Sequence, residues 1–220
     1  REPPKVNITV SKVWNDDSNA YGNRPSSINL DVYNSSGSYI TSTTLSGSGN
    51  TWSKTIYDLP KDSYYVRESS ITGYSSPSYS GTQVTNSLLR TSVKVTKKWD
   101  DDSNRDGKRP GSIKVILYAN GTAFSSATLQ SSGSWSHTFT NLPQYINGSK
   151  VTYTVDEDSV PTGYTKSGPS GSASSGFTIT NSHTPERTNE KITKIWNDIN
   201  DVEKIRPSSI TVTLCKNGTA

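Results

Sequence analysis

A stretch that occurs three times in the chain limits the fold more than any other feature of the sequence. It reads SKVWNDDSNAYGNRPSSINLDVY at residues 11–33, TKKWDDDSNRDGKRPGSIKVILY at 96–118 and TKIWNDINDVEKIRPSSITVTLC at 193–215. Self-similarity at a spacing of this size is typical of an array of small domains. The sequence therefore predicts one complete repeat at residues 1–88, a second at 89–186, and the N-terminal part of a third, truncated repeat at 187–220.

Within each repeat, apolar residues alternate with polar ones in short segments. Ile28, Leu30 and Val32 alternate after RPSS, and the same alternation follows RPGS in the second repeat. This period of two is typical of strands that bury one face, and no segment has the period of a helix. Only 29% of the residues are hydrophobic, which favours two-layer β-structure whose outer faces are exposed to solvent. We therefore expect an all-β fold of tandem β-sandwiches.

The joints between the repeats are short, and they read NSLLRTS at residues 86–92 and NSHTPERTNE at 181–190. Short joints favour a head-to-tail arrangement of the repeats in a fairly stiff rod. Each repeat is therefore expected to have its neighbouring repeats of the same chain as partners.

Charge and cysteine content argue against several classes of protein. The formal net charge is only +4, and the basic residues are dispersed among acidic ones, so we expect no nucleic-acid partner. No apolar run reaches the length of a transmembrane helix, so we expect no membrane insertion. Cys215 is the only cysteine, so no intrachain disulfide can form. The chain starts without a signal peptide and stops abruptly, and we interpret it as a fragment of a longer, secreted protein.

Two sets of residues have an alternative functional interpretation. DSNRDG at residues 102–107 matches the opening of a calcium loop, but Ile113 stands where that loop needs a bidentate glutamate. A solvated turn rich in Asp and Asn is the better interpretation, and we expect no metal and no cofactor. Trp14, Trp99 and Trp196 would suit a sugar-binding platform, but their strand parity points them toward the core.

A lysine stands in the inward row of the same strand in every repeat. In VKVTKKWDDD, at residues 93–102, alternation puts Lys97 on the face that carries Val95 and Trp99. Lys12 and Lys194 hold the same position in the other two copies. An ammonium group is thus directed toward the core three times.

Each complete repeat also directs a glutamate and an asparagine inward. Glu68 and Glu157 end the apolar row of one strand, and Asn86 and Asn181 end that of the last strand. The plain interpretation is a buried Lys-Glu ion pair with an Asn hydrogen bond, because an unpaired buried charge is costly. The alternative is chemical, because a desolvated neutral amine is a nucleophile, a protonated carboxylic acid polarises an amide carbonyl, and the Asn amide can release ammonia. The product would be a Lys-Asn isopeptide bond.

The motifs that carry these residues resemble those of the collagen-adhesin B-type (CnaB) domains of Gram-positive surface adhesins and pilins. The shared features are the lysine strand ahead of W-[DN]-D, a segment of the form Y-x-V-x-E ending in GY at residues 64–74 and 153–164, and a final strand ending in Asn. The resemblance covers nearly the whole chain, and it implies an inverse immunoglobulin-like sandwich for each repeat.

The resemblance also implies two intramolecular crosslinks, each with a catalytic glutamate. They would join Lys12 to Asn86 with Glu68 as catalyst, and Lys97 to Asn181 with Glu157 as catalyst. Lys194 of the truncated repeat is unpartnered, because the sequence ends before a matching Glu or Asn.

By this resemblance we expect structural stalk repeats of a cell-wall-anchored, extracellular bacterial surface adhesin or pilin-like protein. The only chemistry expected is one self-directed turnover per repeat, so the chain is not an enzyme acting on a substrate. A host matrix ligand would be held by a domain outside this fragment. Two alternatives stay open: repeats that themselves bind a host matrix or glycan ligand, and a non-catalytic module of a secreted carbohydrate-active enzyme.

Overall fold

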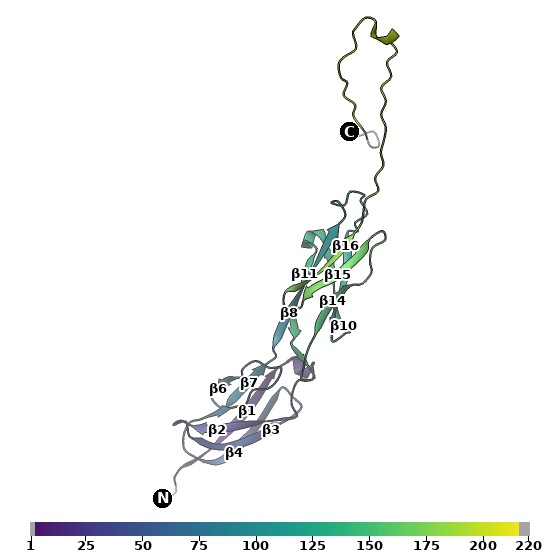
Figure 1. Cartoon of the computed structure of the whole chain (residues 1–220). Coiled ribbons are helices and arrows are strands. Elements are labelled where there is room, and N and C mark those ends of the chain that lie inside the picture. Colours follow the sequence, from purple (N-terminus) through teal and green to yellow (C-terminus); the bar gives the residue numbers. More distant parts are fainter. Residues whose placement is uncertain (1–2, 216–220) are drawn as a thin grey trace. The chain divides into compact units, whose positions relative to one another are not determined.

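The computed structural model describes residues 3–215. The chain divides into two compact units, residues 1–185 and 186–220, and every strand of the described part belongs to the first unit (Figure 1). Regular structure between residues 3 and 215 consists of strands and three short 3₁₀ helices, η1 (Asp17–Asn19), η2 (Ser131–Gly133) and η3 (Ile199–Asp201). The prediction of an all-β fold is confirmed.

The first repeat is a sandwich of two sheets that share one core. The sheets have the strand orders β4-β1-β7-β6 and β3-β2-β5. Their strands are β1 (Lys5–Asn15), β2 (Ser27–Asn34), β3 (Tyr39–Ser46), β4 (Thr51–Pro60), β5 (Tyr64–Arg67), β6 (Ser78–Ser80) and β7 (Gln83–Ser87).

The second repeat has the same arrangement, with sheets of order β11-β8-β16-β15 and β10-β9-β14. Figure 1 shows β8 beside β11 and β16, as the strand order requires. Its strands are β8 (Arg90–Asp100), β9 (Ser112–Ala119), β10 (Thr122–Gln130), β11 (Ser136–Pro143), β14 (Tyr153–Glu157), β15 (Thr165–Ser172) and β16 (Gly176–Ser182). A small hairpin of β12 (Tyr145–Ile146) and β13 (Ser149–Lys150) is added between β11 and β14.

The alternating sequence pattern places one row of each strand in the core. Leu30 and Val32 of β2 are fully buried, and so are Val115 and Leu117 of β9. Each repeat has its own cluster of buried hydrophobic residues, so each builds a separate core. The prediction of tandem β-sandwiches is therefore confirmed.

The first and last strands of each repeat lie side by side and run in the same direction. β1 pairs with β7, and β8 pairs with β16, in the two parallel ladders found among the described strands, whereas their other pairings are antiparallel. Because paired parallel strands point the same way, the chain enters a repeat at one end of this ladder and leaves at the other.

The two sandwiches contact each other directly within the first unit. The side-chain amide of Asn23 donates to the carbonyl of Tyr145 at 2.7 Å and accepts from the Gly148 N–H at 2.9 Å. At the joint, the Leu89 N–H donates to the Gly73 carbonyl at 2.9 Å. The hairpin β12-β13 of the second repeat is therefore fastened to a loop of the first.

The segment after Pro185 lacks the strand that its sequence pattern predicts. Between residues 186 and 215 the only regular element is η3, and Ile192 and Trp196 are 56% and 38% exposed. The prediction that Trp196 packs inward is wrong, because no strand between residues 186 and 215 pairs with this segment to enclose the ring. No helix among residues 3–215 is long and apolar enough to span a membrane.

Candidate crosslinking sites in the two complete repeats

In the first repeat, the predicted lysine and asparagine lie on one face of the β1-β7 ladder. Lys12 stands opposite Val84, and Trp14 stands opposite Asn86. Residues two apart on a strand share a face, so Asn86 is the diagonal neighbour of Lys12. Glu68 comes from the other sheet, directly after β5, and both of its carboxylate oxygens accept from Lys12 Nζ, at 2.7 and 2.6 Å.

In the second repeat, the corresponding residues form a connected triad. Lys97 stands opposite Ile179, and Asn181 lies two residues further along β16. Lys97 Nζ donates to Glu157 Oε2 at 3.0 Å, and Asn181 Nδ2 donates to Glu157 Oε1 at 3.0 Å. The glutamate of β14 therefore bridges the lysine and the asparagine across the sandwich.

These side chains are removed from solvent in both repeats. Lys12, Asn86 and Asn181 are 0% exposed and Lys97 is 3% exposed. The side chains of Glu68 and Glu157 are 2% and 0% exposed. The strand parity read from the sequence thus places all of them inside, whereas Lys194 of the last segment is exposed.

The asparagines are the least satisfied polar groups of the two sites. Asn86 is buried with no hydrogen-bond partner for either Nδ2 or Oδ1, and Asn181 has none for Oδ1. A buried amide without partners is costly, and such groups often have a chemical role. The side-chain carbonyl oxygens of both asparagines are therefore buried without a hydrogen-bond donor.

Burial lowers the pKa of both lysines, as a nucleophilic amine requires. Desolvation lowers the pKa of Lys12 below its usual value, against the opposing effect of Glu68. Desolvation likewise lowers the pKa of Lys97, again against the effect of its glutamate partner. A lower pKa makes the neutral, nucleophilic amine easier to form.

The glutamates of the two repeats differ in their surroundings. Glu157 is part of β14 and pairs in register with Val115, whereas Glu68 follows the last residue of β5. Glu68 also lines a surface groove together with Ile28 and Ser69. The first site is thus more open at its glutamate than the second.

A second buried cluster lies beside each lysine, and its role was not predicted from the sequence. In the first repeat, Asp16 is 1% exposed and accepts from Arg24 Nε at 3.0 Å and from the Tyr74 hydroxyl at 2.7 Å. The second repeat places Asp101, Arg109 and Tyr164 in the same way. The signal was present, because the Asp two positions after Trp, the Arg of RP and the Tyr of GY recur in both repeats.

This cluster is connected to the lysine through a tryptophan. Lys12 Nζ lies 4.3 Å from the ring centroid of Trp14, and the Arg24 guanidinium lies 5.3 Å from the same centroid. In the second repeat, Lys97 and Arg109 lie 5.0 and 5.5 Å from the ring of the corresponding tryptophan. Such cation-π contacts stabilise a cation over an aromatic face. The Asp-Arg pair thus holds in place the ring that covers the lysine.

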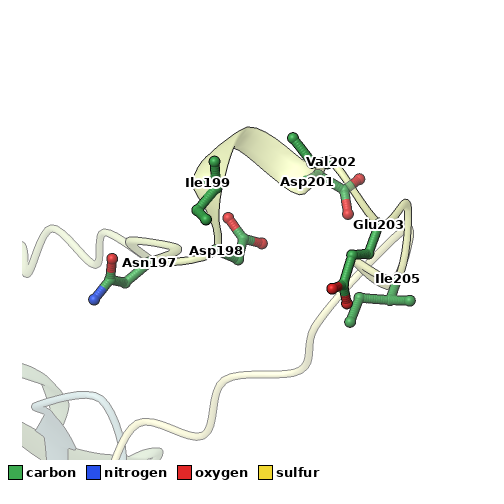
Figure 2. A pocket seen from close by; sticks show the side chains of 7 residues that line it. All are labelled: Asn197, Asp198, Ile199, Asp201, Val202, Glu203 and Ile205. Atoms are coloured by element: carbon green, nitrogen blue, oxygen red, sulfur yellow. The ribbon is translucent and has the colours of Figure 1, made fainter.

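The same local cluster is present after Pro185 without a surrounding sandwich. Arg206 Nε donates to Asp198 Oδ2 at 2.7 Å, and both Arg206 and Lys194 lie over the ring of Trp196. Figure 2 shows the adjoining loop, residues 197–205, whose side chains line a shallow pocket around η3. Sequence-local contacts are therefore sufficient for the Lys-Trp-Arg-Asp cluster, whereas burial of the lysine needs the rest of a repeat.

The Asp101 cluster predicts a specific acid sensitivity. Arg109 beside it lowers the pKa of Asp101 from 3.8 to about 2, although burial opposes this. Because the folded pKa lies below the unfolded value, the stability contribution is complete above about pH 4 and is lost as the pH falls toward 2. We expect the second repeat to lose roughly 2 kcal/mol over this range from Asp101 alone. Urea denaturation between pH 2 and 5 should show a shallower pH dependence for Asp101→Asn, and equal slopes would contradict the assignment.

Comparisons with known proteins agree with this arrangement of paired sandwiches. The family described as Cna protein B-type domain matches residues 8–87, 93–182 and 191–220. A collagen adhesin of Staphylococcus aureus is 35% identical over 225 residues, which cover 98% of this chain and 19% of the adhesin. The chain thus spans about a fifth of the length of that relative.

Several solved structures also resemble this chain. A single B repeat unit (B1) of the collagen-binding surface protein of S. aureus is 34% identical, with a TM-score of 0.41, and the match covers 83% of this chain and 100% of that one. Two B repeat units of the same protein are 34% identical, with a TM-score of 0.45 and coverages of 93% and 56%. The major pilin of Streptococcus pyogenes is 17% identical, with a TM-score of 0.46 and coverages of 82% and 99%.

The fold and the two sites place the chain among proteins built from tandem β-sandwich repeats, here with a buried Lys-Glu pair in each complete repeat. Because the family match extends over most of its residues, the chain belongs to the Cna protein B-type domain family. The resemblance inferred from the sequence motifs is confirmed.

Proposed function

We propose that this chain forms structural stalk repeats whose complete repeats are each locked by one intramolecular isopeptide bond. The bonds join Lys12 to Asn86 and Lys97 to Asn181. The observation that carries the proposal is the same in both repeats: a buried lysine and a buried asparagine share a face of the ladder between the first and last strands, and a glutamate carboxylate contacts the lysine. We propose repeat boundaries at residues 1–88, 89–186 and 187–220.

The proposed reaction needs only these three side chains. The lysine ammonium passes one proton to the glutamate carboxylate, and the neutral amine attacks Cγ of the asparagine while the glutamic acid donates to its carbonyl oxygen. The new C–N bond forms as the bond from Cγ to Nδ2 breaks. The leaving nitrogen takes the second amine proton through the glutamate and departs as ammonia. As the new amide carbonyl forms, the proton on its oxygen returns to the glutamate. Each site reacts once, so the chain does not turn over a substrate.

The bond would close a large loop in a chain that has no disulfide. If it restricts the unfolded chain as a disulfide does, it stabilises each repeat by about 4–5 kcal/mol. Because an amide cannot be reduced, this stabilisation would persist in any redox environment. Such a lock suits repeats that resist force and proteolysis.

The similarity to the S. aureus relatives supports a proposal for the location and partners of this chain. The S. aureus relatives are named as a collagen adhesin and a collagen-binding surface protein. We propose that this chain is likewise part of an extracellular, cell-wall-anchored protein, in which a domain outside these residues binds the host ligand. Within the chain, the partner of each repeat is its neighbour, as in the contact between Asn23 and Tyr145.

One observation bears on the alternative that the repeats themselves bind a ligand. Tyr33 stacks on Tyr65 with ring centroids 5.5 Å apart, and Tyr39, which is 56% exposed, packs edge-on against Tyr33. These tyrosines lie on strands and cover one another, so they do not present open aromatic faces in the loops. The stalk is therefore the better-supported function.

Intact mass tests the crosslinks directly. We expect the purified chain to weigh two ammonia molecules less than its sequence requires. Glu68→Gln and Glu157→Gln should each restore one ammonia, because each removes the proton carrier of one repeat while keeping the size of its side chain. Peptide mapping should find a branched Lys97-Asn181 peptide in Glu68→Gln and a branched Lys12-Asn86 peptide in Glu157→Gln.

The matched control is Glu190→Gln, which changes an exposed glutamate outside both sandwiches. It should keep both bonds. An unmodified mass for the folded native chain would overturn the crosslinks and leave two buried ion pairs.

A further inference from the structure

The glutamate of the second repeat is fastened to the strand next to the asparagine by an ion pair. Lys166 of β15 stands opposite Asn181 of β16 in the ladder, and its Nζ donates to Asp156 Oδ1 at 2.6 Å. Asp156 directly precedes Glu157 on β14, and the same Oδ1 accepts from the Glu157 N–H at 2.7 Å. Since β14 and β15 belong to different sheets, this contact ties the two sheets together beside the three reacting groups.

The first repeat makes a connection at the same place with different residues. There the position before the glutamate is Arg67, whose guanidinium lies 4.8 Å from the ring centroid of Tyr79. The Tyr79 hydroxyl accepts from the Glu68 N–H at 3.2 Å. Tyr79 lies on β6, the edge strand beside the asparagine strand β7, as β15 lies beside β16. Two unrelated sets of side chains therefore hold the backbone of the glutamate to the same edge.

We propose that these two contacts, Lys166-Asp156 and Tyr79-Arg67, are positioning clasps that hold each catalytic glutamate against its lysine and asparagine and thereby set the rate of bond formation. This inference rests on the isopeptide bonds of the proposed function. The clasp residues are positioning residues, because none of them contacts the reacting atoms. Reactions between held groups are sensitive to displacements of this kind, and a shift of about 1 Å can slow them by about 100-fold.

If Lys166 and Asp156 acted only through their charges, removing the two charges would change the rate of bond formation in opposite directions. The charged groups that act on Lys97 are Glu157 and Asp156 of β14 and Lys166 of β15; Lys166 lowers the pKa of Lys97, whereas Asp156 raises it. Removing the charge of Lys166 would therefore disfavour the neutral amine, and removing that of Asp156 would favour it. A clasp predicts instead that either change slows the reaction, because either one frees the glutamate.

The test follows bond formation in the full chain from an unfolded start. Protein made by cell-free synthesis in a short pulse is quenched in denaturant at intervals, and the branched peptide of each repeat is quantified by mass spectrometry. We expect Lys166→Gln and Asp156→Asn each to slow the Lys97-Asn181 bond by about tenfold. Lys166→Arg, which keeps the ion pair, should stay within about twofold of the native rate. In all three variants, the Lys12-Asn86 bond should form at its native rate.

Tyr79→Phe gives the reciprocal experiment. It removes the hydroxyl that accepts from the Glu68 N–H, so it should slow the Lys12-Asn86 bond several-fold and leave the second repeat unchanged. Folding is checked separately by introducing Lys166→Gln into Glu157→Gln, in which no bond can form in the second repeat, and measuring amide hydrogen exchange.

The possible results distinguish positioning by the clasps from an effect of charge alone, from a structural role and from the absence of the crosslinks. Native rates in every variant would overturn the clasps, and so would a slower Lys166→Gln combined with a faster Asp156→Asn, which indicates charge alone. Loss of hydrogen-exchange protection throughout the second repeat would overturn positioning in favour of a structural role. Absence of ammonia loss in both repeats of the native chain would instead overturn the proposed function, and the two failures are thereby distinguished.

Discussion

Under an end-to-end pull, each complete repeat is expected to keep a nearly constant length. With the proposed bond from Lys12 to Asn86 in place, force enters the first repeat along β1, crosses to β7 through that bond, and leaves toward β8. The parallel pairing makes this path short, because residues 11–15 of β1 lie beside residues 83–87 of β7. The chain between the two residues joined by the proposed bond would then carry no tension, and the pull would not unzip the sandwich.

Single-molecule stretching of the full chain measures this effect. Glu68→Gln or Glu157→Gln should add one unfolding step of on the order of 250 Å, because the chain of one repeat is then free to extend. The double variant should give two such steps. Reductant should change nothing in the native chain. Steps of this size from both repeats of the native protein would contradict the crosslinks.

Loss of Arg109 is expected to destabilise the second repeat severely. Its guanidinium holds Asp101, which is 2% exposed, through bonds of 2.9 and 2.5 Å. In Arg109→Ala the carboxylate stays buried without its counter-charge, and breaking a buried pair in this way costs about 3–5 kcal/mol. Amide hydrogen exchange, resolved by repeat, should show the loss in the second repeat alone.

The chain offers a matched control four residues before Arg109. Arg105 pairs with Asp102 at 3.2 Å, but the two side chains are 57% and 47% exposed. Arg105→Ala should therefore cost less than about 1 kcal/mol. Equal effects of the two substitutions would show that the Asp101 pair is no more important than a surface ion pair.

Much of the fold could be predicted because its signals are local. The alternation of Leu30 and Val32 specifies which face of a strand is buried, and three copies of one motif specify the repeat. The inward parity of Lys12 and Lys97 came from the same rule, and both residues are buried in the structure. Alternation alone, however, cannot say which strands become neighbours.

The residues that were missed owe their role to contacts between distant segments. Asp16 accepts a hydrogen bond from the hydroxyl of Tyr74, which lies at the far end of the repeat. Asp156 accepts one from Lys166, which lies on the other sheet. In sequence, Asp16 and Asp156 look like ordinary solvated charges. Trp196 has inward strand parity but is exposed. Strand parity therefore predicts burial only where other strands complete the core.

The repeat, the all-β class and the identity of the inward lysines, glutamates and asparagines can be predicted from the sequence alone. These properties depend on period and residue type, which are written along the chain. The folded structure adds that the first and last strands pair in parallel and that the glutamate reaches across from the opposite sheet. It also shows an Asp-Arg-Tyr cluster and an edge contact beside each site. Strand pairing, the contact of the glutamate with the lysine and the contact of the tyrosine with the aspartate join residues far apart in sequence, so they exist only once the sheets have closed around one core. The Asp-Arg pair, by contrast, forms from local contacts.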